Sequence, residues 1–324
     1  MPMNATAQGF NPLHSASGVK ARWSAADIPS QRGRTAIVTG TGGLGFESAL
    51  ALARTGAHVI VAGRSPSKGA TAVESIRHSV PQANVTFEIL DLASLDSIRA
   101  FAKSMCSSQR SLDVLINNAA VMTPPKRQVT ADGLELQFAT NYLGHFALTA
   151  QLMPLLSKSD RPRVVTVSSV AARQGAIDFD DLQSARRYHP MVAYSQSKLA
   201  CLMFALEMQR RSAAGGWRIQ SMAAHPGISR TNLLPNGAGA WSGPAMLRRF
   251  LWFLFQPAAQ GALPALFAAT SLEAQAGCYY GPDRFGETRG HPTLAEVPPQ
   301  ALDAGRAARL WIESQRLARV TYDV

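Results

Sequence analysis

The sequence predicts an α/β fold built on one doubly wound parallel sheet, and three observations support this. Short runs of apolar and β-branched residues alternate with longer stretches of helical periodicity from Arg34 onward. These runs are apolar at nearly every position, as expected for strands buried on both faces. Right-handed crossovers then place helices on both sides of the sheet. The expected strands are Thr35–Val38, His58–Ala62, Val85–Leu90, Val114–Ile116, Val164–Val167 and Ile219–Ala223.

The stretches between the strands carry apolar residues at helical spacing, which favours a sheet covered by helices. One helix is expected from about Gly45 and a second should run through Arg77. The remaining helices are expected near Ser94–Cys106, Asn141–Leu156, Ala193–Arg211, Ala245–Phe255, Ala258–Thr270 and Leu302–Val320.

The chain length of 324 residues, with 46% hydrophobic residues, suits one large domain with a substantial core. Residues 1–30 are polar and read as a loose extension, whose end Trp23 and Ile28 should attach to the domain of residues 31–324. Residues 235–290 are rich in Gly and Pro and follow the last predicted strand. We expect this irregular region to form a lid over the substrate.

The charge balance of 32 Lys and Arg against 21 Asp and Glu gives a net charge of +11. The basic residues are scattered and lack interleaved aromatic residues, so nucleic acid is not an expected partner. Three dispersed cysteines indicate neither a disulfide framework nor a metal site. No signal peptide and no apolar run of about 18 residues is evident, so we expect a cytoplasmic protein without a transmembrane segment.

A glycine-rich turn, Thr39-Gly40-Thr41-Gly42-Gly43-Leu44-Gly45, joins the first predicted strand to the first helix. Glycines allow the backbone to approach a pyrophosphate at a helix N-terminus, where free N–H groups favour anions. A plain tight turn is the alternative, but the position of this turn favours a Rossmann-type nucleotide site.

Gly63 and Arg64 end the second predicted strand, roughly 20 residues beyond the glycines. An NAD(H) site normally has a carboxylate here for the ribose hydroxyl, whereas a 2′-phosphate calls for a guanidinium. This favours NADP(H) over NAD(H). Lys68 could add positive charge or could be a solvated helix residue.

Tyr194 and Lys198 are four residues apart on a predicted helix, which places the phenol and the ammonium on one face. Ionising a phenol near neutral pH costs about 4 kcal/mol, and a cation about 4 Å away at an effective dielectric of about 20 supplies a similar amount. A surface pair is the alternative. Other polar residues at strand ends, Ser168-Ser169 and Asn117-Asn118, together with Asn141, favour a catalytic site at the carboxyl edge of the sheet.

Taken together, these motifs resemble the short-chain dehydrogenase/reductase family, from about residue 21 to residue 320. The motifs that carry the resemblance are TGTGGLG (39–45), DL (91–92), NNAA (117–120), NYLGH around Asn141, SSVA (168–171), YSQSK (194–198) and HPGISRT (225–231). Two departures are evident: one residue is missing before Gly43, and Ala120 replaces the usual glycine.

The resemblance implies a role for each matching residue. Tyr194 would be the acid and base, Lys198 would assist it and bind the nicotinamide ribose, and Ser169 would orient the substrate oxygen. Asn141 would hold a water that links Lys198 to solvent. The implied cofactor contacts are Gly40, Gly43, Leu44, Gly45, Arg64, Asp91, Leu92, Asn118, Ala119, Ala120, Tyr194, Lys198, Pro226, Gly227, Ile228 and Thr231.

The segment Gly175–Leu182 and the closing Arg309-Leu310-Trp311 resemble the retinol-dehydrogenase and protochlorophyllide-reductase-like branch. The resulting expectation is an NADP(H)-dependent oxidoreductase that interconverts a carbonyl and an alcohol on a lipophilic small molecule. A non-catalytic NADP(H)-binding redox sensor is the alternative, although such proteins typically lose the Tyr/Lys pair. A homodimer or homotetramer is also consistent with the family.

Two further residues or segments invite a role. His225 stands in the HPG motif and is expected to be structural rather than catalytic. The six apolar residues Phe250–Phe255 could meet a bulky substrate, another subunit or a membrane surface, or could simply be buried. Among the three functional roles we favour the substrate, and simple burial stays open beside it.

Overall fold

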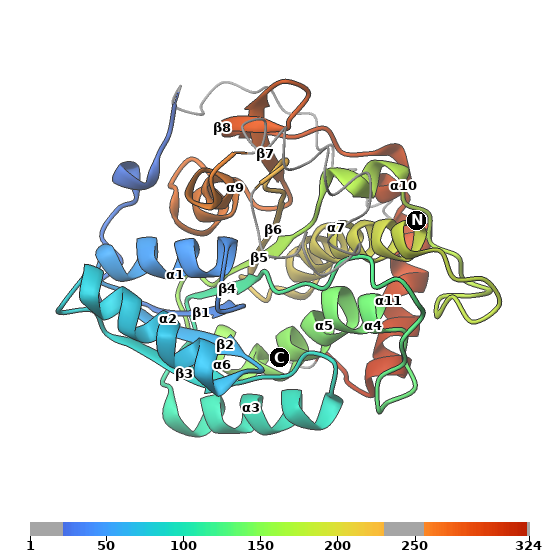
Figure 1. Cartoon of the computed structure of the whole chain (residues 1–324), viewed down its shortest axis with the longest axis horizontal. Helices are drawn as coiled ribbons and strands as arrows, with labels where there is room; N and C mark the ends of the chain where they lie inside the picture. Colours follow the sequence, from blue (N-terminus) through green and yellow to red (C-terminus); the bar gives the residue numbers. More distant parts are fainter. Residues whose placement is uncertain (1–21, 230–255, 323–324) are drawn as a thin grey trace, which may run out of the picture.

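A mostly parallel sheet with the order β3-β2-β1-β4-β5-β6-β7-β8 crosses the protein (Figure 1). The computed structural model describes residues 22–229 and 256–322, and the sheet has eight strands within those residues. The strands are β1 (Thr35–Thr39), β2 (His58–Gly63), β3 (Val85–Ile89), β4 (Val114–Asn117), β5 (Arg163–Val167), β6 (Gln220–Ala224), β7 (Tyr279–Arg284) and β8 (Arg289–Leu294). The predicted doubly wound fold is therefore confirmed.

The order of the strands reverses beside β1, which positions the candidate site. The chain runs outward through β2 and β3, returns to β4 on the other side of β1, and continues outward through β5 and β6. Strand β1 pairs in parallel with both β2 and β4. Their connections therefore leave in opposite directions, which opens a crevice at the carboxyl ends of β1 and β4.

Helices cover both faces of the sheet and form two separate apolar clusters. Helices α1 and α9 pack against each other on one face, and α3, α5, α7 and α11 cover the other (Figure 1). The helices are α1 (Leu44–Arg54), α2 (Pro66–Ser79), α3 (Leu95–Ser108), α4 (Leu136–Phe138), α5 (Gly144–Gln151), α6 (Met153–Leu156), α7 (Pro190–Gly215), α9 (Ala258–Thr270), α10 (Pro299–Leu302) and α11 (Ala304–Ala318).

The helix predicted near Asn141–Leu156 is broken into several pieces. A π-helical turn, Ala139–Leu143, separates α4 from α5, and Pro154 lies in the short helix α6. Such a turn departs from the α-helical hydrogen-bond ladder and is frequent at functional sites. The turn brings Asn141 into the core beneath the candidate site.

Strands β7 and β8 form a hairpin that the sequence analysis missed, since residues 235–290 were expected to be irregular. Strand β7 pairs in parallel with β6, and β8 pairs with β7 in antiparallel fashion. Pro282 and Pro292 face each other across the hairpin, where the register shifts. Prolines mask a strand from pattern analysis. Pro292 is tolerated because β8 is the edge strand, and Pro282 lies beyond Tyr279 and Tyr280, the residues of β7 that pair with β6.

The predicted helix Ala258–Thr270 is confirmed as α9, with the same bounds. The predicted helix near Ala245–Phe255, the apolar run Phe250–Phe255 and the first part of the expected lid, residues 235–255, lie outside the described residues. The rest of the expected lid, residues 256–290, forms α9, β7 and the start of β8 instead of an irregular segment. Within residues 22–229 and 256–322, no helix is both long and apolar enough to cross a bilayer. The same residues contain no cluster of three side chains suited to holding a metal ion.

Trp23 and Ile28 are buried, which confirms that they attach the start of the described chain to the domain. The Trp23 ring stands edge-on to Phe267 of α9, with ring centroids 5.3 Å apart. The backbone carbonyl of Trp23 also lies 3.1 Å from Nδ1 of His291 on β8. These contacts join the N-terminal segment to the face that α9 covers.

Trp23→Ala should lower the free energy of unfolding by about 3–5 kcal/mol, because it leaves a cavity against Phe267. Urea unfolding followed by circular dichroism measures this change. Phe285→Ala is the matched control, since that ring is 75% exposed and its removal should change stability by less than about 0.5 kcal/mol. Equal losses in the two variants would show that Trp23 is not anchored in the core.

Candidate active site

A pocket of about 1010 Å³ opens at the carboxyl edge of the sheet, beside the switch between β1 and β4. Its wall brings together segments that are far apart in the sequence. The predicted site residues that line it are Gly40, Gly43, Leu44, Asn118, Ala119, Ala120, Ser169, Tyr194, Lys198, Pro226, Gly227 and Ile228.

The other predicted site residues lie outside the pocket wall. Gly45 and Asn141 are buried behind it, and Arg64 is exposed at the end of β2. Asp91 accepts a hydrogen bond from the Ala93 amide and so stabilises the turn before α3, while Leu92 is in the core. Thr231 lies outside the described residues.

The glycine-rich turn delivers the N-terminus of α1 to the pocket. Gly40 and Gly43 have φ angles of 101° and 52°, which residues other than glycine rarely adopt. A Cβ on Gly45 would collide with the Gly40 carbonyl oxygen and lie 2.7 Å from Asn118 Nδ2. Although this turn is one residue shorter than the family pattern, α1 still begins directly after Gly43. The N-terminus of α1 can therefore be approached closely by an anionic group.

Thr39 ties the glycine-rich turn to the end of β4. Its hydroxyl accepts hydrogen bonds from the amides of Asn118 and Ala119, at 2.8 and 2.9 Å. Asn118 Nδ2 in turn donates to the Thr39 carbonyl at 2.7 Å. Two separate walls of the pocket are thereby held together by one buried threonine.

Tyr194 and Lys198 both lie on α7 and both reach the pocket although they are almost fully buried. The Lys198 ammonium donates to the Val167 carbonyl at 2.9 Å, and the Ser168 hydroxyl donates to the Lys198 carbonyl at 2.7 Å. These bonds fix α7 against the end of β5. The next residue, Ser169, therefore faces the same pocket as Tyr194.

Asn141 supports the site from behind. Its Nδ2 donates to the Ser197 hydroxyl and to the Val121 carbonyl, both at 2.9 Å, and its Oδ1 accepts from the Val121 amide at 2.7 Å. All these bonds are made to protein groups. The role of Asn141 in holding a water stays a prediction.

Lys68 lines the pocket, together with Ser67, Thr71 and Ser75 of the same helix, α2. The sequence analysis had left open whether Lys68 is a site residue or a solvated one. Arg64 immediately precedes α2 but does not line the pocket. Of these two candidates for added positive charge, Lys68 therefore reaches the pocket and Arg64 does not.

Further pocket residues were not singled out from the sequence. Apolar side chains also line the pocket, and Arg173 and Gln174 add polar groups. The apolar ones are Phe46, Met122, Val167, Val170 and Met191. Val167 ends the predicted strand Val164–Val167, but its strand pattern alone did not indicate that it lines a pocket.

Glu287, in the turn of the β7–β8 hairpin, binds both Arg173 and the buried His225. Glu287 Oε2 lies 2.6 Å from the Arg173 guanidinium and 2.9 Å from His225 Nε2. Nδ1 of His225 accepts from the Gly227 amide, so Nε2 carries the proton that Glu287 accepts. These contacts support the predicted structural role of His225.

The environment shifts the pKa of both partners downward. Burial lowers the pKa of His225, and the hydrogen bond to Glu287 only partly opposes it. Burial alone would raise the pKa of Glu287, but the bonds from His225 and the Glu296 amide, with the charge of Arg173, hold it below its usual value. Neutral His225 and ionised Glu287 therefore fix the loop that contains Gly227.

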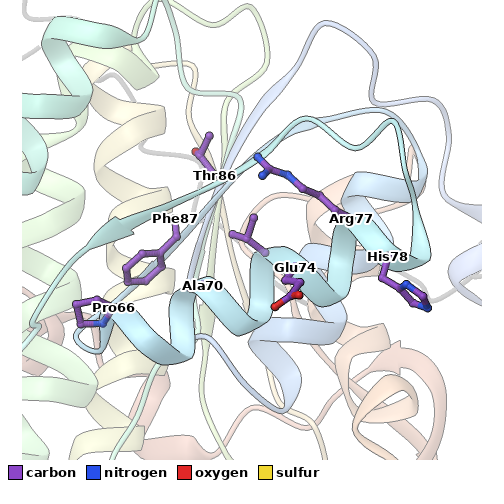
Figure 2. Close-up of a pocket in the computed structure, with 8 residues that line it drawn as sticks. Pro66, Ala70, Glu74, Arg77, His78, Thr86 and Phe87 are labelled. Carbon is purple, nitrogen blue, oxygen red and sulfur yellow. The ribbon is translucent and has the colours of Figure 1, made fainter.

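A second hollow lies apart from this pocket, between α2 and β3 (Figure 2). It measures about 860 Å³, and Figure 2 shows Phe87 beside Pro66 at one end and Arg77 with His78 at the other. Arg77 donates to the Val85 carbonyl at 2.9 Å, which covers part of the sheet edge. None of the predicted site residues lines this groove.

Comparisons with known proteins agree with this geometry. The family model described as short chain dehydrogenase matches residues 34–238. Retinol dehydrogenase 13 of Mus musculus is 40% identical over 301 residues, covering 91% of this chain and 85% of the relative. Polyprenol dehydrogenase of Homo sapiens is 40% identical over 253 residues, covering 76% of each chain. The crystal structure of an uncharacterised protein from Mycobacterium paratuberculosis is 40% identical, with a TM-score of 0.78, covering 94% of this chain and 100% of that one.

Glu287→Gln should lower the free energy of unfolding at neutral pH by about 1–3 kcal/mol, because a charge-assisted bond is lost. Since the folded-state pKa of Glu287 is lowered, its stabilisation is present above the ordinary value and is lost as pH falls through the folded pKa. Because the pKa of His225 is also lowered on folding, the free energy of unfolding decreases further as the pH falls below about 6.5.

Urea unfolding of wild type and variant between about pH 7 and pH 4 measures this difference, which should shrink on the acid side. Glu296→Gln is the control, because residue 296 is exposed. A stability difference that does not change with pH would contradict the assigned ion pair.

Proposed function

Because the chain belongs to the short-chain dehydrogenase/reductase family, in its retinol-dehydrogenase-like branch, we propose that it is an NADP(H)-dependent oxidoreductase interconverting a carbonyl and an alcohol. The observation that carries the proposal is a single pocket shared by the glycine-rich turn and by Ser169, Tyr194 and Lys198. A protein that only senses NADP(H) would not need a buried phenol and ammonium beside the same pocket. Their presence favours catalysis over sensing.

The pocket residues fit a dinucleotide cofactor. The N-terminus of α1, with the close-packed Gly40 and Gly45, suits the pyrophosphate, and Asn118 to Ala120 with Pro226 to Ile228 line the rest of the pocket. The nicotinamide of the bound cofactor supplies or accepts the hydride. The remaining chemistry, which is proton transfer and orientation, belongs to the side chains of this protein.

In the reducing direction, the Tyr194 phenol donates a proton to the substrate oxygen as the carbonyl becomes an alcohol. The Ser169 hydroxyl donates a hydrogen bond to the same oxygen and so orients the substrate. The Lys198 ammonium, fixed by the Val167 carbonyl, stabilises the phenolate that Tyr194 leaves behind. In the oxidising direction the same groups act in reverse.

A lipophilic substrate is supported by the pocket wall and by the relatives. Met122, Val170 and Met191 line the pocket together with Tyr194. The two curated relatives described above are named for retinol and polyprenol, which are both long apolar alcohols. A panel of apolar and polar aldehydes, ketones and alcohols, assayed by NADPH absorbance, tests this proposal. Turnover restricted to small polar substrates, or no turnover at all, would contradict it.

Tyr194→Phe should reduce turnover by at least about 100-fold, because the proton donor is lost. NADPH binding, measured by fluorescence titration, should stay within a few-fold of wild type. Tyr188→Phe is the matched control, since its hydroxyl donates to the Pro124 carbonyl, away from the pocket. Substantial turnover in Tyr194→Phe would refute the assignment of the acid.

Lys68→Ala should weaken NADPH binding about 10- to 150-fold and leave NADH binding nearly unchanged, because only NADPH carries a 2′-phosphate. Arg64→Ala should act in the same direction but less strongly, since Arg64 does not line the pocket. Isothermal titration with both cofactors measures the ratio, and Lys103→Ala on the exposed side of α3 is the control. Equal weakening of NADPH and NADH would exclude the phosphate contact.

A further inference from the structure

His145 is a buried imidazole on α5 that the proposed reaction does not use. It is only 1% exposed, yet both ring nitrogens have partners. Nε2 lies 2.9 Å from the Thr39 hydroxyl, and Nδ1 lies 2.9 Å from the Asn141 carbonyl oxygen. Burying a histidine costs stability unless its ring nitrogens are hydrogen-bonded, so the donor and the acceptor in each of these two bonds need to be assigned.

Counting protons fixes the direction of both bonds. The Thr39 hydroxyl already accepts from the amides of Asn118 and Ala119, which occupies both of its lone pairs. Its own proton has two acceptors within reach, the Ile116 carbonyl at 3.4 Å and Nε2 of His145 at 2.9 Å. A protonated Nε2 would find no free lone pair on Thr39, so the shorter contact is the hydroxyl donating to an unprotonated Nε2. The Asn141 carbonyl can only accept, so Nδ1 must carry the ring proton.

The surroundings favour this neutral tautomer. Burial lowers the pKa of His145 to about 4; the bond to the Asn141 carbonyl opposes this, and the nearby Lys198 charge adds to it. His145 is thus uncharged at neutral pH. An imidazolium would also aim a second N–H at a hydroxyl that has no free lone pair.

Each bond leads to a different part of the candidate site. Through Thr39, His145 is joined to the glycine-rich turn and to Asn118 and Ala119, which line the expected cofactor site. Through Asn141, it is joined to the Ser197 hydroxyl, one residue before Lys198. The Cys201 thiol also donates to the Asn141 carbonyl at 3.1 Å, so this carbonyl accepts hydrogen bonds from two side chains.

The π-helical turn makes this second connection accessible. Ala139–Leu143 departs from the α-helical ladder, and Gly144 N donates to the Ala139 carbonyl five residues earlier. The carbonyl of Asn141 is then reached by side chains from α5 and from α7. The His145 imidazole consequently connects Thr39, at the expected cofactor site, with Asn141, which is bonded to the helix that contains Tyr194.

We propose that His145 is a positioning residue that holds the cofactor-binding turn and the catalytic helix in register through Thr39 and Asn141. This inference rests on the proposed function, because it assigns the two ends of the bridge to cofactor and catalysis. No atom of His145 is placed in contact with substrate. Substitution of His145 should therefore change NADPH affinity through the Thr39 bond and turnover through the Asn141 bond.

Two near-isosteric variants separate the two bonds. The amide oxygen of Gln reaches the position of Nε2, so His145→Gln retains an acceptor for Thr39 and loses the donor to Asn141. The amide nitrogen of Asn lies near Nδ1, so His145→Asn retains the donor and loses the acceptor. His145→Leu loses both bonds. Thr270→Ser is the control, because it keeps a hydroxyl that bonds within α9, away from the pocket.

We expect His145→Asn to raise the Kd for NADPH about 5- to 10-fold, with kcat at saturating NADPH within about 3-fold of wild type. His145→Gln should show the opposite split, with Kd within about 2-fold and kcat lowered about 10-fold. His145→Leu should show both losses, and Thr270→Ser neither. Fluorescence titration gives Kd, and steady-state kinetics gives kcat.

Equal Kd values for the Asn and Gln variants, or losses that follow only their melting temperatures, would overturn the assignment. The binding measurement needs no substrate, so it remains decisive if the substrate class has been chosen wrongly. Wild-type protein that binds neither NADPH nor NADH would instead refute the proposed function, and the inference would fall with it.

Discussion

The reversal of strand order beside β1 is the constraint on which the candidate site depends. Chain connections leave β1 and β4 in opposite directions, so the crevice between them cannot be filled by a crossover. Every polar residue that follows a parallel strand is then delivered to one edge. Thr39, Asn118 and Ser169 meet there because each follows or ends a strand that is buried on both faces. The fold thereby assembles the site before any specific contact is considered.

Buried hydrogen bonds turn this gathering of residues into a defined geometry. Lys198 is 3% exposed, and its ammonium would be costly to bury without the Val167 carbonyl. The Thr39 hydroxyl accepts from the amides of Asn118 and Ala119 and makes its shortest remaining contact with His145. Satisfied polar networks of this kind are rigid, and rigidity is what a proton donor beside a cofactor requires. Buried hydrogen bonds behind the pocket-lining residues therefore help to fix the geometry of the site.

The sequence could predict what depends on local patterns. Apolar runs identified strands β1 to β6, and the spacing of Tyr194 and Lys198 placed both on one helix face that does line the pocket. Features that depend on tertiary contacts could not be predicted. Glu287 reaches His225 only because the hairpin folds back over β6, and prolines hide that hairpin. His145 also carries no local signal, because only the packing of α5 gives its ring partners.

We propose that this pocket transfers a hydride between a nicotinamide and a carbon atom held beside Tyr194. The most direct test uses NADPH deuterated at C4, prepared separately at each of the two C4 positions, with an apolar aldehyde or ketone. Mass spectrometry of the alcohol should find deuterium on the carbinol carbon from only one of the two labelled cofactors, because a fixed pocket presents one face. An alcohol without deuterium from either cofactor, or with deuterium from both, would contradict the account.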